Sequence, residues 1–290
     1  MTEIGKKTGT FSSFDGTNIY YEVRGDGEPV IFVYGIACLI NHWHHQINYF
    51  SKSYQTIAFD LRGHHKSSIP IDEKNKTIAC TSKDIVYLMD HLKIKKAHFA
   101  GHSFGVPVLL DFAANYPDRV KSIALVNGFA SNPMNDAFGL GVVDKLYGFI
   151  QSQYSNNKLL FDLLWSSAIN NPISMWLSGL AGGFNLKLTQ FKDIEIYARG
   201  VSQISLEIFI PLFGDMMRFD GRRMCQQINS PVLVVGGDHD LVTPLKFQEE
   251  LHSELKNSEY VVVPYGSHCS QLDFPDYLNL KLEKFFESHK

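Results

Sequence analysis

Short apolar runs alternate with amphipathic stretches along the first 126 residues and again from residue 231 onwards. The run 29–34 is continuously apolar and the run 54–60 is largely so, which is typical of strands covered on both faces. Residues 77–92 carry apolar side chains at helical spacing. Strands are predicted at residues 8–14, 18–24, 29–34, 54–60, 96–100, 120–126, 231–235 and 259–263. Helices are predicted at residues 41–52, 77–92, 106–116, 244–255 and 273–286.

This alternation of strands and helices predicts an α/β fold. Strands joined through helices form a mainly parallel sheet with right-handed crossovers. Near the N-terminus, Asp15-Gly16-Thr17 separates two strands directly and is typical of a hairpin turn. The hairpin predicts an antiparallel edge on the otherwise parallel sheet.

The pattern changes between residues 131 and 223, where the strand–helix alternation stops. Amphipathic pieces rich in leucine, phenylalanine and isoleucine are broken at Asn171-Pro172, Gly182-Gly183 and Pro211. We interpret residues 131–223 as a helical cap inserted into a core domain formed by residues 1–130 and 224–290. Trp165 and Trp176 are expected in the interior of the cap, and some cap side chains should roof a pocket.

Composition narrows the class of protein. Of the 290 residues, 44% are hydrophobic, and 27 basic side chains against 30 acidic ones give a net charge of −3. This balance gives no reason to expect a nucleic-acid partner. No apolar run has the length of a membrane span or the form of a secretory signal, so we expect a cytoplasmic protein without a membrane span. Cys38, Cys80, Cys225 and Cys269 lack C-x-x-C spacing, which indicates neither zinc nor disulfides. The oligomeric state, monomer or dimer, stays open.

The pentapeptide Gly101-His102-Ser103-Phe104-Gly105 lies between a predicted strand and a predicted helix. A serine between two glycines in that context has the form of a nucleophile elbow. The turn is tight enough to strain the serine backbone, and the glycines remove the collisions that side chains would cause. Ser103 is therefore the candidate nucleophile.

An acid and a base follow the elbow in chain order. Asp238 and Asp240 come after the strand predicted at 231–235, and His268 comes after the strand at 259–263. In an open α/β sheet, functional residues gather at the carboxyl ends of the strands. A serine hydroxyl needs an imidazole to take its proton, and a carboxylate to hold that imidazole in one tautomer. Asp240 also has a purely structural alternative, which is to cap the following helix.

The developing oxyanion of such a reaction needs backbone N–H donors. The N–H of Phe104, at the start of the helix after the nucleophile, is one candidate, and the N–H of Ile36 is the other. Tyr34, Trp43 and His102 are candidates for lining a substrate pocket.

These motifs resemble those of α/β-hydrolase-fold proteins of the capped, esterase-like kind. The resemblance rests on Gly101 to Gly105, Phe59-Asp60-Leu61-Arg62-Gly63-His64, Gly237 to Pro244 and Gly266-Ser267-His268. It implies an eight-stranded, mostly parallel sheet flanked by helices, with a helical cap. It also implies catalysis by a triad that requires no metal or organic cofactor.

Within the family the acid lies in a G-x-x-D-x-x-x-P context, which selects Asp240 over Asp238. Some members carry the acid after the strand that follows the nucleophile helix, but Asn127-Gly128 offers no carboxylate there. Two positions depart from the family pattern. Tyr34 stands where members usually have histidine, beside the expected oxyanion loop, and His65 stands where they usually have glycine.

Five histidines that lie near one another in the sequence raise the question of a metal-binding site. They are His42, His44, His45, His64 and His65. The His42-Trp43-His44-His45 run lacks the aspartate of dinuclear hydrolase spacings, and no downstream ligand set is evident in the sequence. We therefore predict no metal site, and we expect solvated or pocket-lining histidines.

Together these features predict a serine hydrolase that cleaves an ester or related acyl bond of a small, partly hydrophobic substrate through an acyl-enzyme on Ser103. Dehalogenases and epoxide hydrolases of this family use an aspartate as the nucleophile. A serine at that position therefore excludes their chemistry as the family performs it. Thioesterase, lactonase, carbon–carbon bond hydrolase and cofactor-free haloperoxidase activities stay open. A ligand-binding, receptor-like protein with a slow triad is the alternative from another class.

Overall fold

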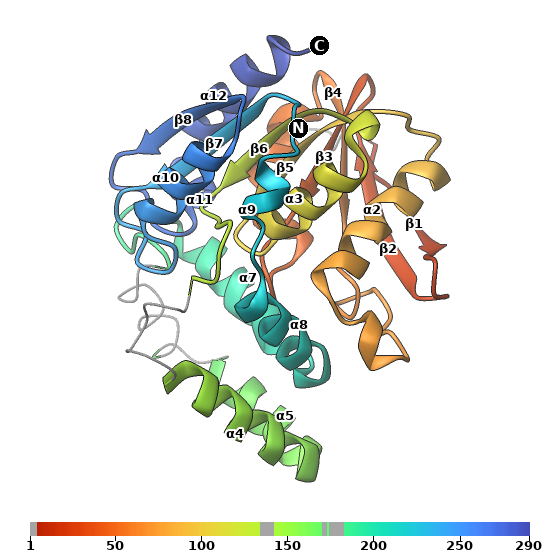
Figure 1. Ribbon diagram of the computed structural model, residues 1–290, viewed down its shortest axis with the longest axis vertical. Helices are drawn as coiled ribbons and strands as arrows, with labels where there is room; N and C mark the ends of the chain where they lie inside the picture. Colours follow the sequence, from red (N-terminus) through yellow and green to blue (C-terminus); the bar gives the residue numbers. More distant parts are fainter. Residues whose placement is uncertain (1–4, 134–141, 170–172, 174–182) are drawn as a thin grey trace.

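A single eight-stranded sheet forms the centre of the molecule (Figure 1). The computed structural model describes residues 5–133, 142–169, 173 and 183–290. The strands are β1 (Lys7–Ser12), β2 (Asn18–Arg24), β3 (Glu28–Val33), β4 (Tyr54–Phe59), β5 (Ala97–His102), β6 (Val120–Val126), β7 (Val232–Gly237) and β8 (Ser258–Val263). Their order across the sheet is β1-β2-β4-β3-β5-β6-β7-β8. Only the pairings of β2 with β1 and β4 are antiparallel, which confirms the predicted fold class.

Helices cover both faces of this sheet. Helices α2 (Ile78–His91) and α3 (Gly105–Asn115) pack on each other, and α3 also contacts β5 and β6. Helix α10 (Leu245–Glu254) contacts β7 and β8. Helix α1 (His44–Phe50) contacts β4 and α12 (Pro275–Glu287). The strands therefore lie between helical layers, and β5, β6 and β7 are almost entirely buried.

One predicted helix is divided in the structure. The segment predicted at 41–52 begins with a short 3-10 helix, η1 (Ile40–Trp43), before α1. The helix predicted at 273–286 corresponds to α12, which begins at Pro275, and a separate short helix, α11 (Ser270–Asp273), precedes it. Proline has no backbone N–H to continue a helix, but it is favoured in a first turn. The remaining short turns are η2 (Glu73–Asn75) and η3 (Pro117–Arg119).

Between β6 and β7 the described chain is helical. It contains α4 (Val142–Asn156), α5 (Lys158–Ile169), α7 (Phe191–Ser202), α8 (Leu206–Arg218) and α9 (Arg222–Cys225). Figure 1 shows α4 and α5 farthest from the sheet, with α7 and α8 between them and the sheet. Helix α7 contacts η1, and α8 contacts α2. The break expected at Asn171-Pro172, together with Trp176 and Gly182, lies outside the described residues.

None of the described helices combines the length and the apolar character that crossing a membrane would require.

Candidate active site

Ser103 occupies a tight turn between β5 and α3. Its φ angle is 52°, in the left-handed region that is unfavourable for residues with a side chain, so the predicted strain is present. A Cβ atom on Gly101 would lie 2.7 Å from Leu109 Cδ1 and 2.9 Å from the Gly105 carbonyl oxygen. A Cβ atom on Gly105 would overlap the Val33 carbonyl oxygen. Both glycines are therefore required by close packing around the serine.

The structure brings the three candidate catalytic side chains into one hydrogen-bonded chain. His268 Nε2 lies 2.9 Å from Ser103 Oγ, and His268 Nδ1 lies 2.9 Å from Asp240 Oδ2. Ser103 follows β5, Asp240 follows β7 and His268 follows β8, so all three lie beyond the carboxyl ends of strands. With a proton on Nδ1 shared with Asp240, His268 presents its Nε2 lone pair to the serine hydroxyl.

The Asp240 carboxylate is held by four further donors. Oδ1 accepts from the backbone N–H groups of Val242 and Thr243, each at 2.8 Å. Oδ2 accepts from the Thr243 hydroxyl at 2.8 Å and from Asn127 Nδ2 at 3.0 Å. Asn127 directly follows β6, and this position is the sequence signal that could have identified it as a partner of Asp240. Asp238, by contrast, bonds to the exposed His239 at 2.6 Å.

A second group of contacts holds the loop that carries Ile36. A Cβ atom on Gly35 would lie 3.1 Å from Ser103 Cβ, so this loop runs directly beside the serine. Across the described loops and turns, no backbone carbonyl accepts from the Ile36 or Phe104 N–H. The next residue, Ala37, has a φ of 59° and donates its N–H to His64 Nε2 at 3.0 Å.

His64 is wholly buried, so the expectation of a solvated or pocket-lining histidine is wrong for this residue. Its Nδ1 lies 3.1 Å from the Arg62 carbonyl oxygen and donates to it. Burial lowers the pKa of His64 to about 4, which keeps the ring neutral and leaves Nε2 free to accept from Ala37. His64 therefore positions the loop that carries one of the candidate oxyanion donors.

The predictions that Tyr34 and Trp43 line the substrate pocket are wrong. The Tyr34 hydroxyl accepts from the Leu61 N–H at 2.9 Å and donates to Asp60 at 3.2 Å, and its side chain is wholly buried. Trp43 is also wholly buried and packs on Phe32, with 5.4 Å between ring centroids. Both side chains belong to the hydrophobic core, and neither lines the cavity over Ser103.

A cavity of about 280 Å³ opens over Ser103 and His268, and His102 lines it as predicted. Its wall is mainly apolar, and several side chains come from the segment between β6 and β7. The sequence predicted that some side chains of this segment would roof a pocket, but it did not identify which ones. The described residues that line it are Ile36, Cys38, His102, Ser103, Phe129, Pro133, Gly183, Phe184, Tyr197, Phe213, Met216, Val242, Thr243, His268 and Cys269.

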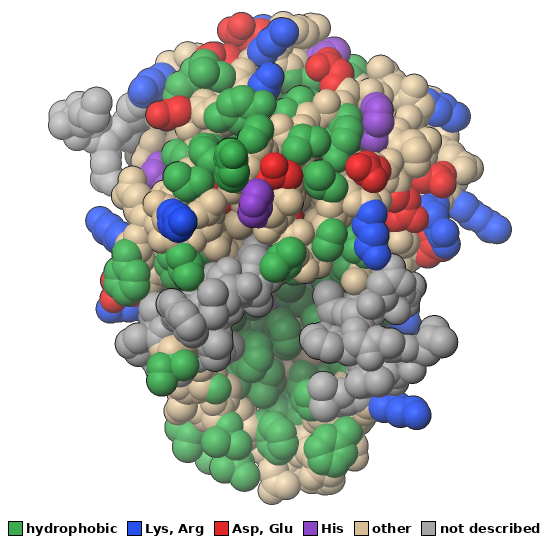
Figure 2. Space-filling view, turned by 90° about the vertical axis from the view of Figure 1, so that its left-hand side faces the viewer, with side chains coloured by type: hydrophobic (Ala, Val, Ile, Leu, Met, Phe, Trp, Pro, Cys, Tyr) green, Lys and Arg blue, Asp and Glu red, His purple; other side chains and the backbone are tan. Residues whose placement is uncertain are grey.

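A second hollow of about 490 Å³ lies between α4, α5 and α8. Figure 2 shows hydrophobic side chains gathered in a hollow toward this end of the molecule. Its described lining consists of Tyr147, Ile150, Phe161, Leu164, Trp165, Ala168, Leu206, Phe209, Ile210 and Phe213. Phe213 borders both this hollow and the cavity over Ser103.

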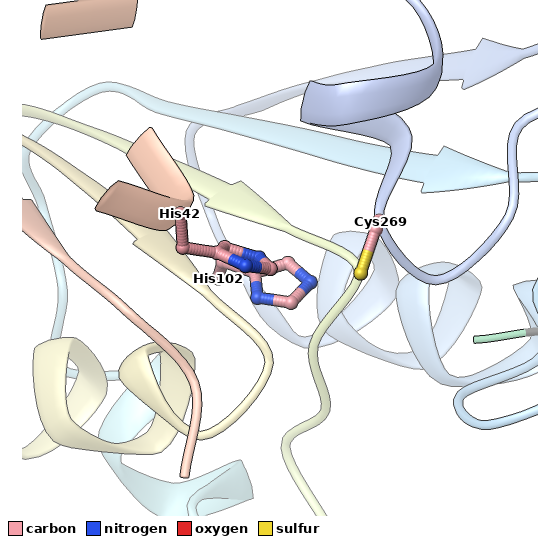
Figure 3. A group of neighbouring side chains, drawn as sticks. All are labelled: His42, His102 and Cys269. Atoms are coloured by element: carbon pink, nitrogen blue, oxygen red, sulfur yellow. The ribbon is translucent and has the colours of Figure 1, made fainter. Parts of the chain in front are cut away.

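Next to the triad lies a buried group formed by His42, His102 and Cys269 (Figure 3). His102 Nε2 donates to the His268 carbonyl oxygen at 2.8 Å and so helps to place the candidate catalytic imidazole. Burial lowers the pKa of His42 to about 3 and that of His102 well below its usual value. Burial also raises the pKa of the Cys269 thiol, so all three side chains are uncharged near neutral pH.

The donor atoms of this buried group lie within 4.8 Å of one another, but the thiol would have to ionise in a desolvated site to bind a metal. A second group with metal-binding side chains, His44, His45 and Asp193, lies between α1 and α7 and is partly exposed.

Comparison with known families agrees with the observed fold. A family model described as the α/β hydrolase fold matches residues 28–188, which is more than half of the chain. A second model, described as TAP-like protein, matches residues 218–287.

Similar proteins have several activities. The chain is 28% identical over 271 residues to the dihydrolipoyllysine-residue acetyltransferase component of the acetoin cleaving system of Pseudomonas putida, covering 93% of this chain and 66% of that protein. It is 25% identical over 260 residues to 3-oxoadipate enol-lactonase 2 of Acinetobacter baylyi, covering 90% and 89%. The enol-lactonase structure from Burkholderia xenovorans LB400 superimposes with a TM-score of 0.76 at 21% identity, covering 96% and 100%. The curated lactonase supports a general hydrolase activity, and the solved structure supports the fold.

Proposed function

We propose that this chain, which belongs to the α/β-hydrolase fold family, is a serine hydrolase that acts on an ester or related acyl bond. One observation carries the proposal, namely the continuous chain from Ser103 Oγ through His268 to the buried Asp240 carboxylate, with both contacts at 2.9 Å. This is the arrangement that a serine needs in order to lose its proton as it attacks.

In the first half of the reaction, Ser103 Oγ attacks the carbonyl carbon while its proton passes to His268 Nε2. Asp240 stabilises the imidazolium that forms. The carbonyl oxygen becomes an oxyanion, and the backbone N–H groups of Ile36 and Phe104 donate to it. Each such donor contributes about 3–4 kcal/mol of transition-state stabilisation.

His268 then donates its proton to the leaving alkoxide oxygen, which departs as an alcohol and leaves an acyl-enzyme on Ser103. In the second half, a water molecule attacks the acyl carbon and gives its proton to His268. Collapse of this second intermediate releases the carboxylic acid and returns the proton to Ser103.

The cavity favours a small substrate with an apolar acyl or alkyl part. Phe129, Phe184, Phe213 and Met216 contribute apolar surface around Ser103, and a volume of about 280 Å³ suits a small molecule. A lactone is the second candidate substrate, because it is a cyclic ester and similar proteins include enol-lactonases.

Labelling with a fluorophosphonate, together with turnover of short p-nitrophenyl esters, tests the proposal. Wild type should be labelled, and Ser103→Ala should lose labelling and about 10⁶-fold in kcat. Ser258→Ala, which removes a serine that bonds to the exposed His252, is the matched control and should behave as wild type. Full turnover by Ser103→Ala would refute the mechanism. Labelling without measurable turnover of any ester would favour the receptor-like alternative.

A further inference from the structure

Two consecutive histidines at the start of α1 face one carboxylate of α7. His45 Nε2 lies 3.0 Å from Asp193 Oδ2, and His44 Nε2 lies 3.4 Å from Asp193 Oδ1. The Asp193 side chain is 5% exposed, whereas the two imidazoles are 24% and 23% exposed. A nearly buried carboxylate from the insertion therefore meets two imidazoles from the core at a point that solvent reaches.

The hydrogen bond on the far side of His44 fixes its tautomer. His44 Nδ1 lies 2.8 Å from the Asn41 carbonyl oxygen, which can only accept, so Nδ1 carries the proton. In the neutral ring, Nε2 then presents a lone pair to the Asp193 carboxylate. Two electron-rich atoms thus face each other, and a cation between them would relieve the repulsion.

The spacing of these atoms suits a transition-metal ion. Bonds of about 2.0–2.2 Å in tetrahedral geometry place neighbouring ligand atoms about 3.3–3.5 Å apart. The separation of His44 Nε2 from Asp193 Oδ1, 3.4 Å, falls in this range. The separation of His45 Nε2 from Asp193 Oδ2, 3.0 Å, is that of a direct hydrogen bond and would lengthen by a few tenths of an ångström around an ion. All three ligand atoms lie within 4.8 Å of one another. The bond from His44 Nδ1 to a backbone carbonyl is the outer contact that metal-ligating histidines usually make.

A small cavity supports the same interpretation. Its volume is about 10 Å³, and its lining includes His44 and Asp193. This is the scale of a single water molecule. An ion bound by three protein ligands would use such a water, or solvent at the exposed side, as its fourth ligand.

We propose that His44, His45 and Asp193 form a binding site for a divalent transition-metal ion of the zinc type, which joins α7 to α1. The proposal departs from the sequence-based expectation of no metal, because the carboxylate comes from a residue almost 150 positions away, which the sequence alone does not place beside the histidines. One turn of α7 after Asp193, Tyr197 lines the cavity over Ser103 and packs on His42 at 5.4 Å between ring centroids. The ion would therefore fix one wall of the substrate cavity without contacting the reacting atoms.

Isothermal titration of the metal-stripped full chain with Zn²⁺ tests the proposal. Wild type should bind one ion at this site, and Asp193→Asn or His45→Gln should weaken binding by about 10- to 100-fold or more, since even outer-shell losses have effects of that size. Glu195→Gln, on the same helix and paired with Arg199, is the matched control and should bind as wild type. Mg²⁺ should not compete, because it prefers oxygen ligands.

Hydrogen exchange gives a second readout that is independent of activity. Zn²⁺ should slow amide exchange along α7 in wild type and in Glu195→Gln, but not in Asp193→Asn. If Asp193→Asn fails to fold by circular dichroism, His45→Gln and His44→Gln supply the same comparison. Absence of saturable binding below roughly 100 µM Zn²⁺ would overturn the proposal. Binding that survives in Asp193→Asn and His45→Gln but disappears in Cys269→Ser would also overturn it, because the ion would then belong to the buried group.

Discussion

Two histidine–aspartate pairs in this molecule have nearly the same separation but different surroundings. His268 and Asp240 lie 2.9 Å apart, and His45 and Asp193 lie 3.0 Å apart. Four further donors hold Asp240, and the second nitrogen of His268 faces the Ser103 hydroxyl. The Asp193 carboxylate instead meets a second imidazole, that of His44. The comparison teaches that the groups around such a pair, rather than the pair itself, determine its chemistry.

The two pairs also differ in what they connect. Asp240 and His268 follow adjacent strands of one sheet, the buried β7 and the edge strand β8. Asp193 stands on α7, between β6 and β7, and His45 stands on α1, between β3 and β4. The first pair therefore joins the loops after two neighbouring strands, and the second joins two helices.

The largest expected difference between the two pairs is in catalysis. Asp240→Asn should lower kcat for p-nitrophenyl esters by about 10⁴-fold, because the amide favours the wrong His268 tautomer. Asp193→Asn removes the corresponding charge from the other pair and should leave kcat within about threefold, because no proton is transferred there. Steady-state kinetics with fluorophosphonate titration of active sites measures both. Similar losses in the two variants would mean that the catalytic pair is misassigned.

Two glycine-to-alanine substitutions, one beside Ser103 and one on α4, extend the comparison to stability. Gly105→Ala places a methyl group against the Val33 carbonyl oxygen and should lower the free energy of unfolding by about 3 kcal/mol, with a loss of kcat as Ser103 shifts. Gly148→Ala, on α4, meets open space and should stabilise the protein by about 0.5–1 kcal/mol. Urea unfolding at neutral pH measures the two changes. A tolerated Gly105→Ala would show that the elbow is less constrained than its packing indicates.

A smaller effect concerns a buried histidine that lacks a carboxylate partner. The pKa of His64, about 4 in the folded protein, is below the value of about 6.5 expected in the unfolded chain. The stability that depends on neutral His64 is therefore complete above pH 6.5 and is lost as the pH falls toward 4. Between pH 6.5 and 4.5 the loss amounts to about 2–3 kcal/mol.

Urea unfolding at several pH values tests this linkage. His64→Gln retains a donor and an acceptor but cannot titrate, so its stability should fall less between pH 6.5 and 4.5 than that of wild type, by about 2–3 kcal/mol. His252→Gln, at an exposed histidine, is the control and should follow wild type. Parallel pH curves for wild type and His64→Gln would show that this histidine does not stay neutral in the fold.

Much of the core could be predicted because its signals are local. Continuous apolar runs correspond to buried parallel strands, and the predicted bounds of β2 and β6 agree with the structure to the residue. The elbow glycines indicated the conformation of Ser103, since only a residue without a side chain fits beside it. The roles of Ser103, Asp240 and His268 stay predictions until they are tested by substitution.

The sequence alone determined the order of the strands and helices of the sheet and the fold class, because apolar periodicity and turn signals depend on side chains within a few residues of one another. The candidate triad followed from chain order together with the family resemblance, which selected Asp240 over Asp238. Only the tertiary structure decided which side chains face the cavity, excluded Tyr34 and Trp43, and assigned His64 to the loop beside Ser103. It also brought Asp193 to His44 and His45. These contacts join residues far apart in the chain, and they arise from packing between elements, which hydrophobic periodicity does not encode.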